Sequence, residues 1–353
     1  MAQRHGFVTN TIHAGGSETT PSVPIHLGAT TNARYMRSGN PTLDAFEENV
    51  RILDGGSAAI STSCGMAAVS QTLLALLSPG DRIVCHYTVY HWTTHMMQNT
   101  LPKWGVDVDM LDLTDLDQMA TALGKPAAVV YFEPVANPKL EVIDTAKVIQ
   151  MAHEVGAKVV IDNTYLSPYL FKPLEYGADI VLHSATKYLC GHGDSLAGIV
   201  VTRDENLGQQ IVTMRNTMGG ILSPVNAYLL IRGIKTLSMR MDRHCANAQA
   251  VAEYLVDHPN VVAVAYPGLP ASQGHEIAKT QWRGYGGMVF FKIGDETLHK
   301  RFLDTVKLCR PWVSLGDAGS LVSDRSENQV RMSVGLEDIE DILADLEQAL
   351  NGA

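Results

Sequence analysis

The stretch Asp179-Ile-Val-Leu-His-Ser-Ala-Thr-Lys-Tyr-Leu-Cys-Gly-His-Gly193 is the most informative part of this sequence, because it places Lys187 just after a short apolar run. A lysine at the end of a buried strand is partly desolvated, which disfavours its charged form and leaves a nucleophilic amine. Ser184 and Thr186 are short donors that can hold a phosphate. The pattern suits a lysine that binds pyridoxal phosphate (PLP) through a Schiff base. Taken alone, Ser-x-Thr-Lys fits an ordinary surface lysine better, so the rest of the chain has to decide.

Length and composition limit the class of protein. The 353 residues are enough for a large core and two domains, and a hydrophobic share of 46% indicates a globular chain. The net charge of −10 is spread without a basic stripe, which argues against nucleic acid and anionic membranes as partners. The N-terminus has no apolar leader pattern and no run is long enough to span a bilayer, so we expect a cytoplasmic protein.

The cysteines and histidines do not predict a metal site. The five cysteines are odd in number and lack metal or disulfide spacing, so we expect free thiols in a reducing compartment. His91 and His95 are one helical turn apart and His86 is close in sequence, but no carboxylate or cysteine completes a ligand set. We therefore predict no metal.

The chain divides into three parts by composition and periodicity. Residues 1–40 are rich in Gly, Ser, Thr and Pro and predict an extended N-terminal arm that needs another surface to order it. In residues 41–235, short apolar runs alternate with helical patterns, which predicts an α/β domain with a mostly parallel sheet flanked by helices. Residues 236–353 predict a smaller α+β domain. Ligands of such sheets bind at the carboxyl ends of the strands.

Individual elements follow from the same patterns. The expected strands of the larger domain are short apolar runs: Ile83–Cys85, Ala128–Phe132, Val159–Ile161, Ile180–Leu182 and Ala197–Val201. In the smaller domain we expect strands at Met288–Ile293 and Gln329–Ser333. Apolar residues at helical spacing predict helices at Met66–Leu77, Thr145–Val155, Thr236–Asp257 and Leu336–Leu350.

Three further features fit a PLP site when they are taken with Lys187. Gly65 and Met66 open a predicted helix, whose amides and positive end can take a phosphate, although a helix start alone needs only the flexibility of glycine. Asp162 follows a predicted strand and can keep a pyridine nitrogen protonated; the alternative is an ordinary helix cap. Tyr90 can stack on the ring, or it can be a core aromatic residue.

Several motifs then occur in a family order. They include Tyr35–Thr42 (Tyr-Met-Arg-Ser-Gly-Asn-Pro-Thr), Cys64–Ala68, Asp162–Tyr165, the Lys187 stretch and Arg331–Gly335. On these motifs the sequence resembles the Cys/Met-metabolism family of fold-type I PLP enzymes over nearly its whole length. The resemblance implies a fold-type I, transferase-like PLP fold.

The resemblance also implies roles for the cofactor residues. Lys187 carries PLP and shuttles protons, Asp162 pairs with the pyridine nitrogen, and Asn137 lies by the phenolic oxygen of the ring. The residues implied to hold the phosphate are Gly65, Met66, Ser184 and Thr186.

Further roles concern the substrate and a second subunit. Arg331 corresponds to the arginine that grips the substrate α-carboxylate, Ser314 helps to position the substrate and Lys187, and Tyr90 is an acid or base. Tyr35 and Arg37 match a Tyr-x-Arg pair that reaches the phosphate of a neighbouring subunit. The resemblance therefore implies a homo-oligomer, a tetramer built from dimers that share active sites.

Within the family, stretches such as 232–236 and 241–249 are most like methionine γ-lyases. This implies γ-elimination on a sulfur-containing amino acid, which gives a 2-oxo acid, ammonia and a thiol. Two alternatives stay open: γ-replacement on an O-acylhomoserine, of the sulfhydrylase or cystathionine γ-synthase type, and a PLP-binding protein that has lost catalysis.

The sequence departs from the family pattern around the substrate pocket. Gly319 replaces a glutamate that is common in cystathionine-using members, and His91 and Trp92 replace small residues after Tyr90. Residues 322–329 form a shorter stretch than usual, and the arm between Thr30 and Tyr35 is also trimmed. From the two shortened segments we hypothesise a more open active-site mouth.

Overall fold

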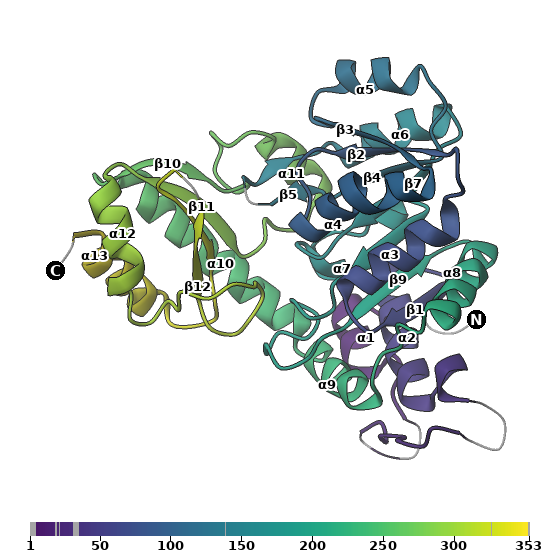
Figure 1. The fold of residues 1–353 in the computed structure, drawn as a ribbon. Helices are drawn as coiled ribbons and strands as arrows, with labels where there is room; N and C mark the ends of the chain where they lie inside the picture. Colours follow the sequence, from purple (N-terminus) through teal and green to yellow (C-terminus); the bar gives the residue numbers. More distant parts are fainter. Residues whose placement is uncertain are drawn as a thin grey trace.

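A seven-stranded sheet forms the centre of the larger domain, in the strand order β1-β9-β8-β7-β4-β2-β3 (Figure 1). The computed structural model describes residues 5–17, 20, 22–30, 35–137, 139–325 and 327–351. The strands of this sheet are β1 (Ala58–Thr62), β2 (Arg82–His86), β3 (Asp107–Leu111), β4 (Val129–Phe132), β7 (Lys158–Asp162), β8 (Ile180–His183) and β9 (Gly198–Thr202). Strands β3, β2, β4, β7 and β8 are parallel, and β9 is antiparallel to both β8 and β1. The predicted mostly parallel sheet is confirmed.

Helices cover both faces of this sheet (Figure 1). Successive side chains of one strand enter different core clusters: Val130 and Val159 belong to one, and Val129 and Val160 to the other. A strand that is buried on both faces needs apolar residues at every position, which explains the continuous apolar runs. The helices of this domain are α2 (Pro41–Asp54), α3 (Gly65–Leu76), α4 (His91–His95), α5 (Leu116–Leu123), α6 (Thr145–Glu154), α7 (Ser167–Leu170), α8 (Glu205–Met218) and α9 (Pro224–Ile234).

Short elements complete the larger domain. Strands β5 and β6 pair as a separate two-stranded ribbon. These elements are the 3-10 turns η1 (Met36–Ser38), η3 (Leu101–Trp104) and η4 (Pro173–Tyr176), the π-helical turn η2 (Met96–Thr100), and the strands β5 (Val135–Ala136) and β6 (Glu141–Val142).

The smaller domain is built on an antiparallel sheet of order β10-β11-β13-β12. Helix α10 runs from the junction of the domains into the smaller one, where it lies behind the sheet (Figure 1). Its strands are β10 (Val261–Ala265), β11 (Met288–Ile293), β12 (Leu321–Arg325) and β13 (Gln329–Ser333). The helices that follow the larger domain are α10 (Leu237–Asp257), α11 (His275–Gln281), α12 (Glu296–Thr305) and α13 (Ile339–Asn351).

The N-terminal arm is not extended throughout, so this expectation is wrong in part. Residues Phe7–His13 form helix α1. The Phe7 ring lies 5.2 Å from the Tyr169 ring, and the Asn49 side chain donates to the carbonyl of Ala14 at 2.7 Å. Burial of one aromatic ring against the larger domain thus orders a segment whose composition alone predicts no helix. Residues 31–34, within the trimmed part of the arm, lie outside the described residues.

The last helix begins later than its apolar pattern predicts. Helix α13 starts at Ile339, not at Leu336. The backbone amide of Leu336 donates to the carbonyl of Ala318 at 2.7 Å, which ties this residue to the loop before β12. Within the described part of the chain, no helix has the length and apolar character needed to cross a membrane.

Candidate active site

Lys187 lies in the turn that follows β8, at the carboxyl edge of the large sheet. The turn is held by a hydrogen bond from the backbone amide of Lys187 to the carbonyl of Ser184, at 3.1 Å. The Lys187 Nζ donates to the Ser314 Oγ at 2.7 Å. Burial, and then the positive charge of Arg331, lower the pKa of Lys187, while Asp317 acts in the opposite direction. The structure therefore supplies the desolvated amine that the sequence predicts.

Ser314 brings the smaller domain to this lysine and has a strained backbone. Its φ of 106° lies in the region that glycine favours. The carbonyl of Ser314 accepts a hydrogen bond from the Arg331 Nη2 at 2.9 Å, and the Arg331 Nη1 donates to the Asn137 Oδ1 at 3.3 Å. Lys187, Ser314, Arg331 and Asn137 thus form one connected group across the two domains. The buried Nε of Arg331 has no hydrogen-bond partner among the described residues, which leaves a donor for an anion.

Asp162 is buried at the end of β7 and belongs to the same edge of the sheet. Its Oδ1 accepts from the backbone amide and the hydroxyl of Thr164, at 3.0 and 2.5 Å. Burial raises the pKa of Asp162, while these two hydrogen bonds and the charge of His183 act to lower it. In the described parts of the chain no lysine or arginine forms an ion pair with this carboxylate. A cation on a bound ring would offset its desolvation cost.

The start of α3 faces the turn that carries Lys187. An added Cβ at Gly65 would lie 2.7 Å from the Cβ of Ser184 and 2.9 Å from its Oγ, so glycine is needed for this close approach. The N-cap residue Cys64 makes no side-chain cap, which leaves the first amides of the helix for a ligand. The Ser184 Oγ makes no hydrogen bond within the described ranges. Met66 lies in the first turn of α3, and its Sδ accepts from the Thr93 hydroxyl at 3.6 Å.

Thr186 is placed differently from Ser184. Its hydroxyl donates to the carbonyl of Ala197 at 3.2 Å and accepts from the amide of the same residue at 3.0 Å. The side chain therefore ties the lysine turn to the segment before β9, and its role toward a phosphate stays a prediction.

These observations fit pyridoxal phosphate. The buried carboxylate of Asp162 suits a protonated ring nitrogen, and the open helix start beside Ser184 suits a phosphate. Lys187 lies on the same edge of the sheet, with a lowered pKa that suits covalent attachment. Among the described residues, no group of three or more His, Cys, Asp and Glu side chains is placed to hold a metal ion.

Tyr90 begins a row of aromatic rings that the sequence only partly indicates. Its ring centroid lies 4.5 Å from that of His91, which is 5.4 Å from Trp92, and Trp92 is 5.5 Å from His95. The Tyr90 amide donates to the Glu133 Oε1 at 2.6 Å. Tyr90 is 42% exposed and Trp92 is 53% exposed. His91 and Trp92 therefore lie next to Tyr90 at the protein surface, where small residues would leave space.

Tyr35 and Arg37 do not join this group within one chain. Both are exposed, and the Arg37 guanidinium lies 5.0 Å from the centre of the Tyr35 ring. Thr30 and Tyr35 form an isolated antiparallel bridge at the base of the arm. The expected contact of this pair with a neighbouring subunit stays a prediction.

Sequence patterns did not predict the buried residues that form hydrogen bonds next to the site. The His183 Nε2 donates to the Asp54 Oδ2 at 2.9 Å and its Nδ1 donates to the carbonyl of Asn163 at 3.2 Å, and the side chain is buried. Thr164 accepts from the backbone amide of Ser184 at 2.7 Å, so it connects Ser184 with Asp162. Thr164 and His183 lie within motifs that the sequence shows, whereas nothing near Asp54 in the sequence indicates its partner.

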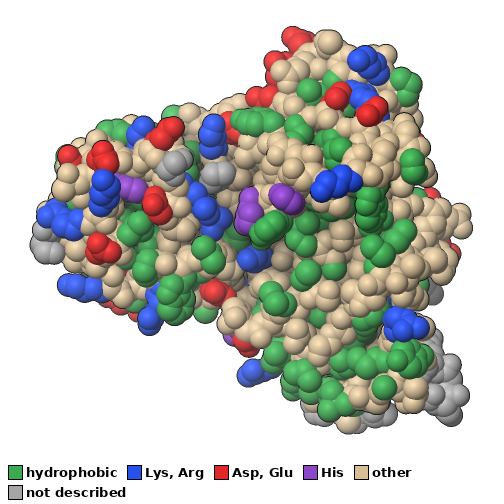
Figure 2. Space-filling model, in the orientation of Figure 1, with side chains coloured by type: hydrophobic (Ala, Val, Ile, Leu, Met, Phe, Trp, Pro, Cys, Tyr) green, Lys and Arg blue, Asp and Glu red, His purple; other side chains and the backbone are tan. Residues whose placement is uncertain are grey.

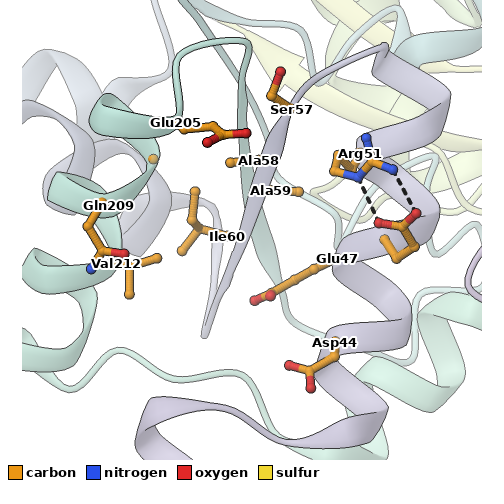
Figure 3. A pocket seen from close by; sticks show the side chains of 12 residues that line it. Asp44, Glu47, Arg51, Ser57, Ala58, Ala59, Ile60, Glu205, Gln209 and Val212 are labelled. Atoms are coloured by element: carbon orange, nitrogen blue, oxygen red, sulfur yellow. Dashed lines mark hydrogen bonds and ion pairs between the residues drawn. The ribbon is translucent and has the colours of Figure 1, made fainter.

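A separate hollow of about 370 Å³ lies between α2, β1 and α8 (Figure 3). Glu47 in this hollow accepts from the Ser61 hydroxyl at 2.7 Å and from Arg215 at 3.0 Å, and Glu48 is paired with Arg51. Glu47 therefore links α2 with the edge strand β1 and with α8, whereas the pair of Glu48 and Arg51 lies within α2. None of the predicted site residues lines the hollow. Away from this hollow, Figure 2 shows histidines and basic side chains near the boundary between the two domains.

Comparison with known proteins agrees with pyridoxal phosphate as the cofactor. The model of a family described as Cys/Met metabolism PLP-dependent enzyme matches residues 8–351. The chain is 39% identical to an L-methionine gamma-lyase of Fusobacterium nucleatum subsp. polymorphum over 389 aligned positions, which cover 99% of this chain and 98% of the relative. It is also 39% identical to a cystathionine beta-lyase of Lactococcus lactis subsp. cremoris, with coverage of 97% and 98%. Because 389 aligned positions exceed 353 residues, the first relative contains segments that this chain lacks.

The fold is shared with a solved structure of the same kind. The crystal structure of cystathionine gamma synthase from Xanthomonas oryzae pv. oryzae in complex with aminoacrylate and cysteine matches with a TM-score of 0.95 and 36% identity, covering 98% of each chain. The expected architecture, a mostly parallel sheet flanked by helices with a smaller α+β domain, is therefore confirmed.

Proposed function

The chain belongs to the Cys/Met metabolism PLP-dependent enzyme family, and from this premise we propose that it is a PLP-dependent carbon–sulfur lyase. Its reaction is the γ-elimination of a sulfur-containing amino acid to a 2-oxo acid, ammonia and a thiol, as the relatives named L-methionine gamma-lyase suggest. The observation that carries the proposal is the hydrogen bond of 2.7 Å between Lys187 and Ser314, next to the half-satisfied guanidinium of Arg331.

Each residue then has a chemical task. When bound, pyridoxal phosphate supplies an electron sink for the negative charge that develops next to the substrate amino group. Arg331 binds the α-carboxylate through two parallel hydrogen bonds. The Lys187 amine, held by Ser314, removes the proton from Cα, because its lowered pKa leaves it neutral more often than an exposed lysine. We assign the exchange of a proton with the departing γ-substituent to the Tyr90 hydroxyl.

Other residues hold the cofactor. Asp162 would keep the ring nitrogen protonated, and Asn137, which accepts from Arg331, would contact the ring. The amides of Gly65 and Met66, with the hydroxyls of Ser184 and Thr186, bind the phosphate. A larger side chain at Gly65 would separate α3 from Ser184.

We further propose a homo-oligomer, a tetramer built from dimers that share active sites, in which Tyr35 and Arg37 bind the phosphate in the neighbouring subunit. The exposure of both residues supports this. We also propose a cytoplasmic location, because all five cysteines are free thiols.

The first test is product formation from methionine. We expect the purified holoenzyme to release 2-oxobutyrate, ammonia and methanethiol in equal amounts, measured by a coupled dehydrogenase assay and a thiol reagent. L-norleucine is the matched control, because it has the same length but no leaving group. If no γ-substituted amino acid yields an oxo acid, the lyase proposal is wrong.

The 42% exposure of Tyr90 leaves this side chain accessible to a second substrate from solvent, which supports γ-replacement as the second candidate. This reaction uses the same residues for the first deprotonation. Incubation of O-acetylhomoserine with a thiol distinguishes the two: a thioether product identifies replacement, and 2-oxobutyrate identifies elimination.

A change at Arg331 tests how the substrate is bound. We expect Arg331→Lys to raise KM by roughly 10- to 100-fold, because an ammonium cannot form the bidentate contact, with a smaller change in kcat. Steady-state kinetics with methionine measure both constants. Arg243→Gln removes an exposed arginine of α10 and should leave both unchanged. An unaltered KM in Arg331→Lys would contradict the assigned role.

A further inference from the structure

The sheet of the smaller domain turns a basic face toward the larger domain. Arg331 is opposite Phe290 on one side and Ser323 on the other, and all three point to the same face. Phe290 packs in the core cluster of the larger domain, and Arg331 contacts Asn137, so this face lies at the boundary between the domains. The next row of the same face consists of Lys292, Gln329 and Arg325.

These two rows contain three cations and no carboxylate. Arg325 makes no hydrogen bond or ion pair in the parts of the chain that the structure describes, and its buried Nε has no partner. The neighbouring Asp324 points to the opposite face, where its Oδ1 lies 3.3 Å from the His299 Nε2. A half-buried guanidinium without a partner lowers stability, and an anion would offset that cost.

Arg325 also acts on the substrate arginine. Burial, and then the charge of Arg325, lower the pKa of Arg331 to about 10. Burial likewise lowers the pKa of Arg325, against the opposing effect of Asp324. Two guanidinium groups that repel each other, with no acid between them, bind a ligand with two negative charges better than a ligand with one.

We infer that Arg325, together with Lys292, forms a second anion-binding subsite, which takes an acid group at the end of the substrate's γ-substituent. Two residues along a strand separate the rows of Arg331 and Arg325, which is about 7 Å. This spacing suits an amino acid whose α-carboxylate lies at Arg331 and whose distal acid lies at Arg325. The inference rests on the proposed function, because it names the substrate class of the same site.

The neighbouring loop agrees with this choice of charge. At Gly319, an added Cβ would meet only the Glu337 Oε1, at 3.7 Å, so packing does not require glycine there. The Glu337 carboxylate is engaged by the amide and the hydroxyl of Ser320, at 2.6 and 3.0 Å. Position 319 therefore supplies no carboxylate that would compete with an anionic ligand for the basic face.

The first experiment measures binding without turnover. L-2-aminoadipate and L-norleucine lack a leaving group and differ mainly in a distal carboxylate. We expect the holoenzyme to bind L-2-aminoadipate more tightly by roughly 10-fold or more, as followed by the change in visible absorbance during titration. Arg325→Met should remove this preference and leave the affinity for L-norleucine unchanged, and Arg325→Lys should restore part of it.

The second experiment compares two esters with the same leaving-group chemistry. O-succinylhomoserine carries a distal carboxylate, and O-acetylhomoserine does not. We expect Arg325→Met to lower kcat/KM roughly 10- to 100-fold for the succinyl ester alone. Arg301→Gln is the matched control, because it removes an exposed arginine from α12, outside this face.

The outcomes separate this inference from the proposed function. The second subsite is overturned if Arg325→Met loses affinity or kcat/KM equally for the ligand with a distal carboxylate and for its partner without one. It is also overturned if Arg325→Met loses neither quantity with either ligand. If the wild type binds L-2-aminoadipate no better than L-norleucine, the inference also fails. If no substrate yields an oxo acid, the lyase function is overturned instead. The binding titration still tests whether Arg325 binds a distal carboxylate, because it does not depend on turnover.

Discussion

Replacement of Lys187 with alanine should lower kcat by at least about 1,000-fold and abolish covalent attachment of the cofactor. The Nζ of Lys187 is the amine that removes the Cα proton, and general acid–base groups contribute roughly 100- to 10,000-fold to rates. Among the described site residues, Lys187 is the lysine that Ser314 binds, so no other amine is in position to replace it. Borohydride reduction followed by peptide mass spectrometry gives a readout that does not depend on turnover: the wild type should carry the label on Lys187.

The matched control for this prediction is Lys103→Ala. Lys103 is exposed in the short turn η3, so its loss should leave activity and labelling unchanged. Circular dichroism and the melting temperature check that Lys187→Ala is folded. A labelled lysine other than Lys187, or more than a tenth of wild-type kcat in Lys187→Ala, would contradict the assignment.

Asp54→Asn should lower the free energy of unfolding by about 3 to 5 kcal/mol near pH 6, because it leaves a buried imidazolium without its partner. Asp54 and His183 are 0% and 1% exposed, and their side chains lie 2.9 Å apart. Burial acts to lower the pKa of His183, but the Asp54 carboxylate, together with the charge of Asp162 and the carbonyl of Asn163, outweighs burial and the pKa is raised. Chemical denaturation of the holoenzyme measures the effect.

The pH dependence of this variant has a definite sign. A histidine with a raised folded-state pKa contributes stability that is fully present below its unfolded pKa of about 6.5. This contribution is lost as the pH rises through the folded pKa. The difference between wild type and Asp54→Asn should therefore narrow at high pH, and a difference that grows with pH would refute the ion pair.

Glu48→Gln is the control on the same helix. Its partner Arg51 is three residues away, and the two side chains are 45% and 33% exposed. An exposed pair of this kind contributes at most about 0.5 kcal/mol, so the variant should be close to the wild type. A similar loss in both variants would mean that α2 responds to any change of charge.

The interior strands of the large sheet could be predicted because both of their faces are buried. The run Val159–Ile161 is apolar at every position, and the structure places it within β7. The edge strand β3 escaped prediction for the opposite reason. β3 has the sequence Asp107-Val-Asp-Met-Leu111 and no fully buried residue, so its pattern resembles that of a loop.

The candidate site was predictable where one short motif carries the chemistry. Asp162 ends β7, Gly65 starts α3 and Lys187 lies in the turn after β8, and parallel strands bring such positions to one edge. Asn137 and Arg331 were expected near the cofactor and substrate, but their hydrogen bond to each other spans 194 residues of sequence. No local pattern encodes a contact at that separation.

The sequence by itself determined the cofactor chemistry, because Lys187 and its neighbours are short-range features that need only a buried strand to act. Only the tertiary structure decided which groups tune that chemistry. Packing of the smaller domain places Ser314 on Lys187, the strand register sets Arg325 on the same face as Arg331, one row away, and the fold buries Asp54 against His183. These effects depend on distance and desolvation in space, and neither quantity is fixed by the order of residues along the chain.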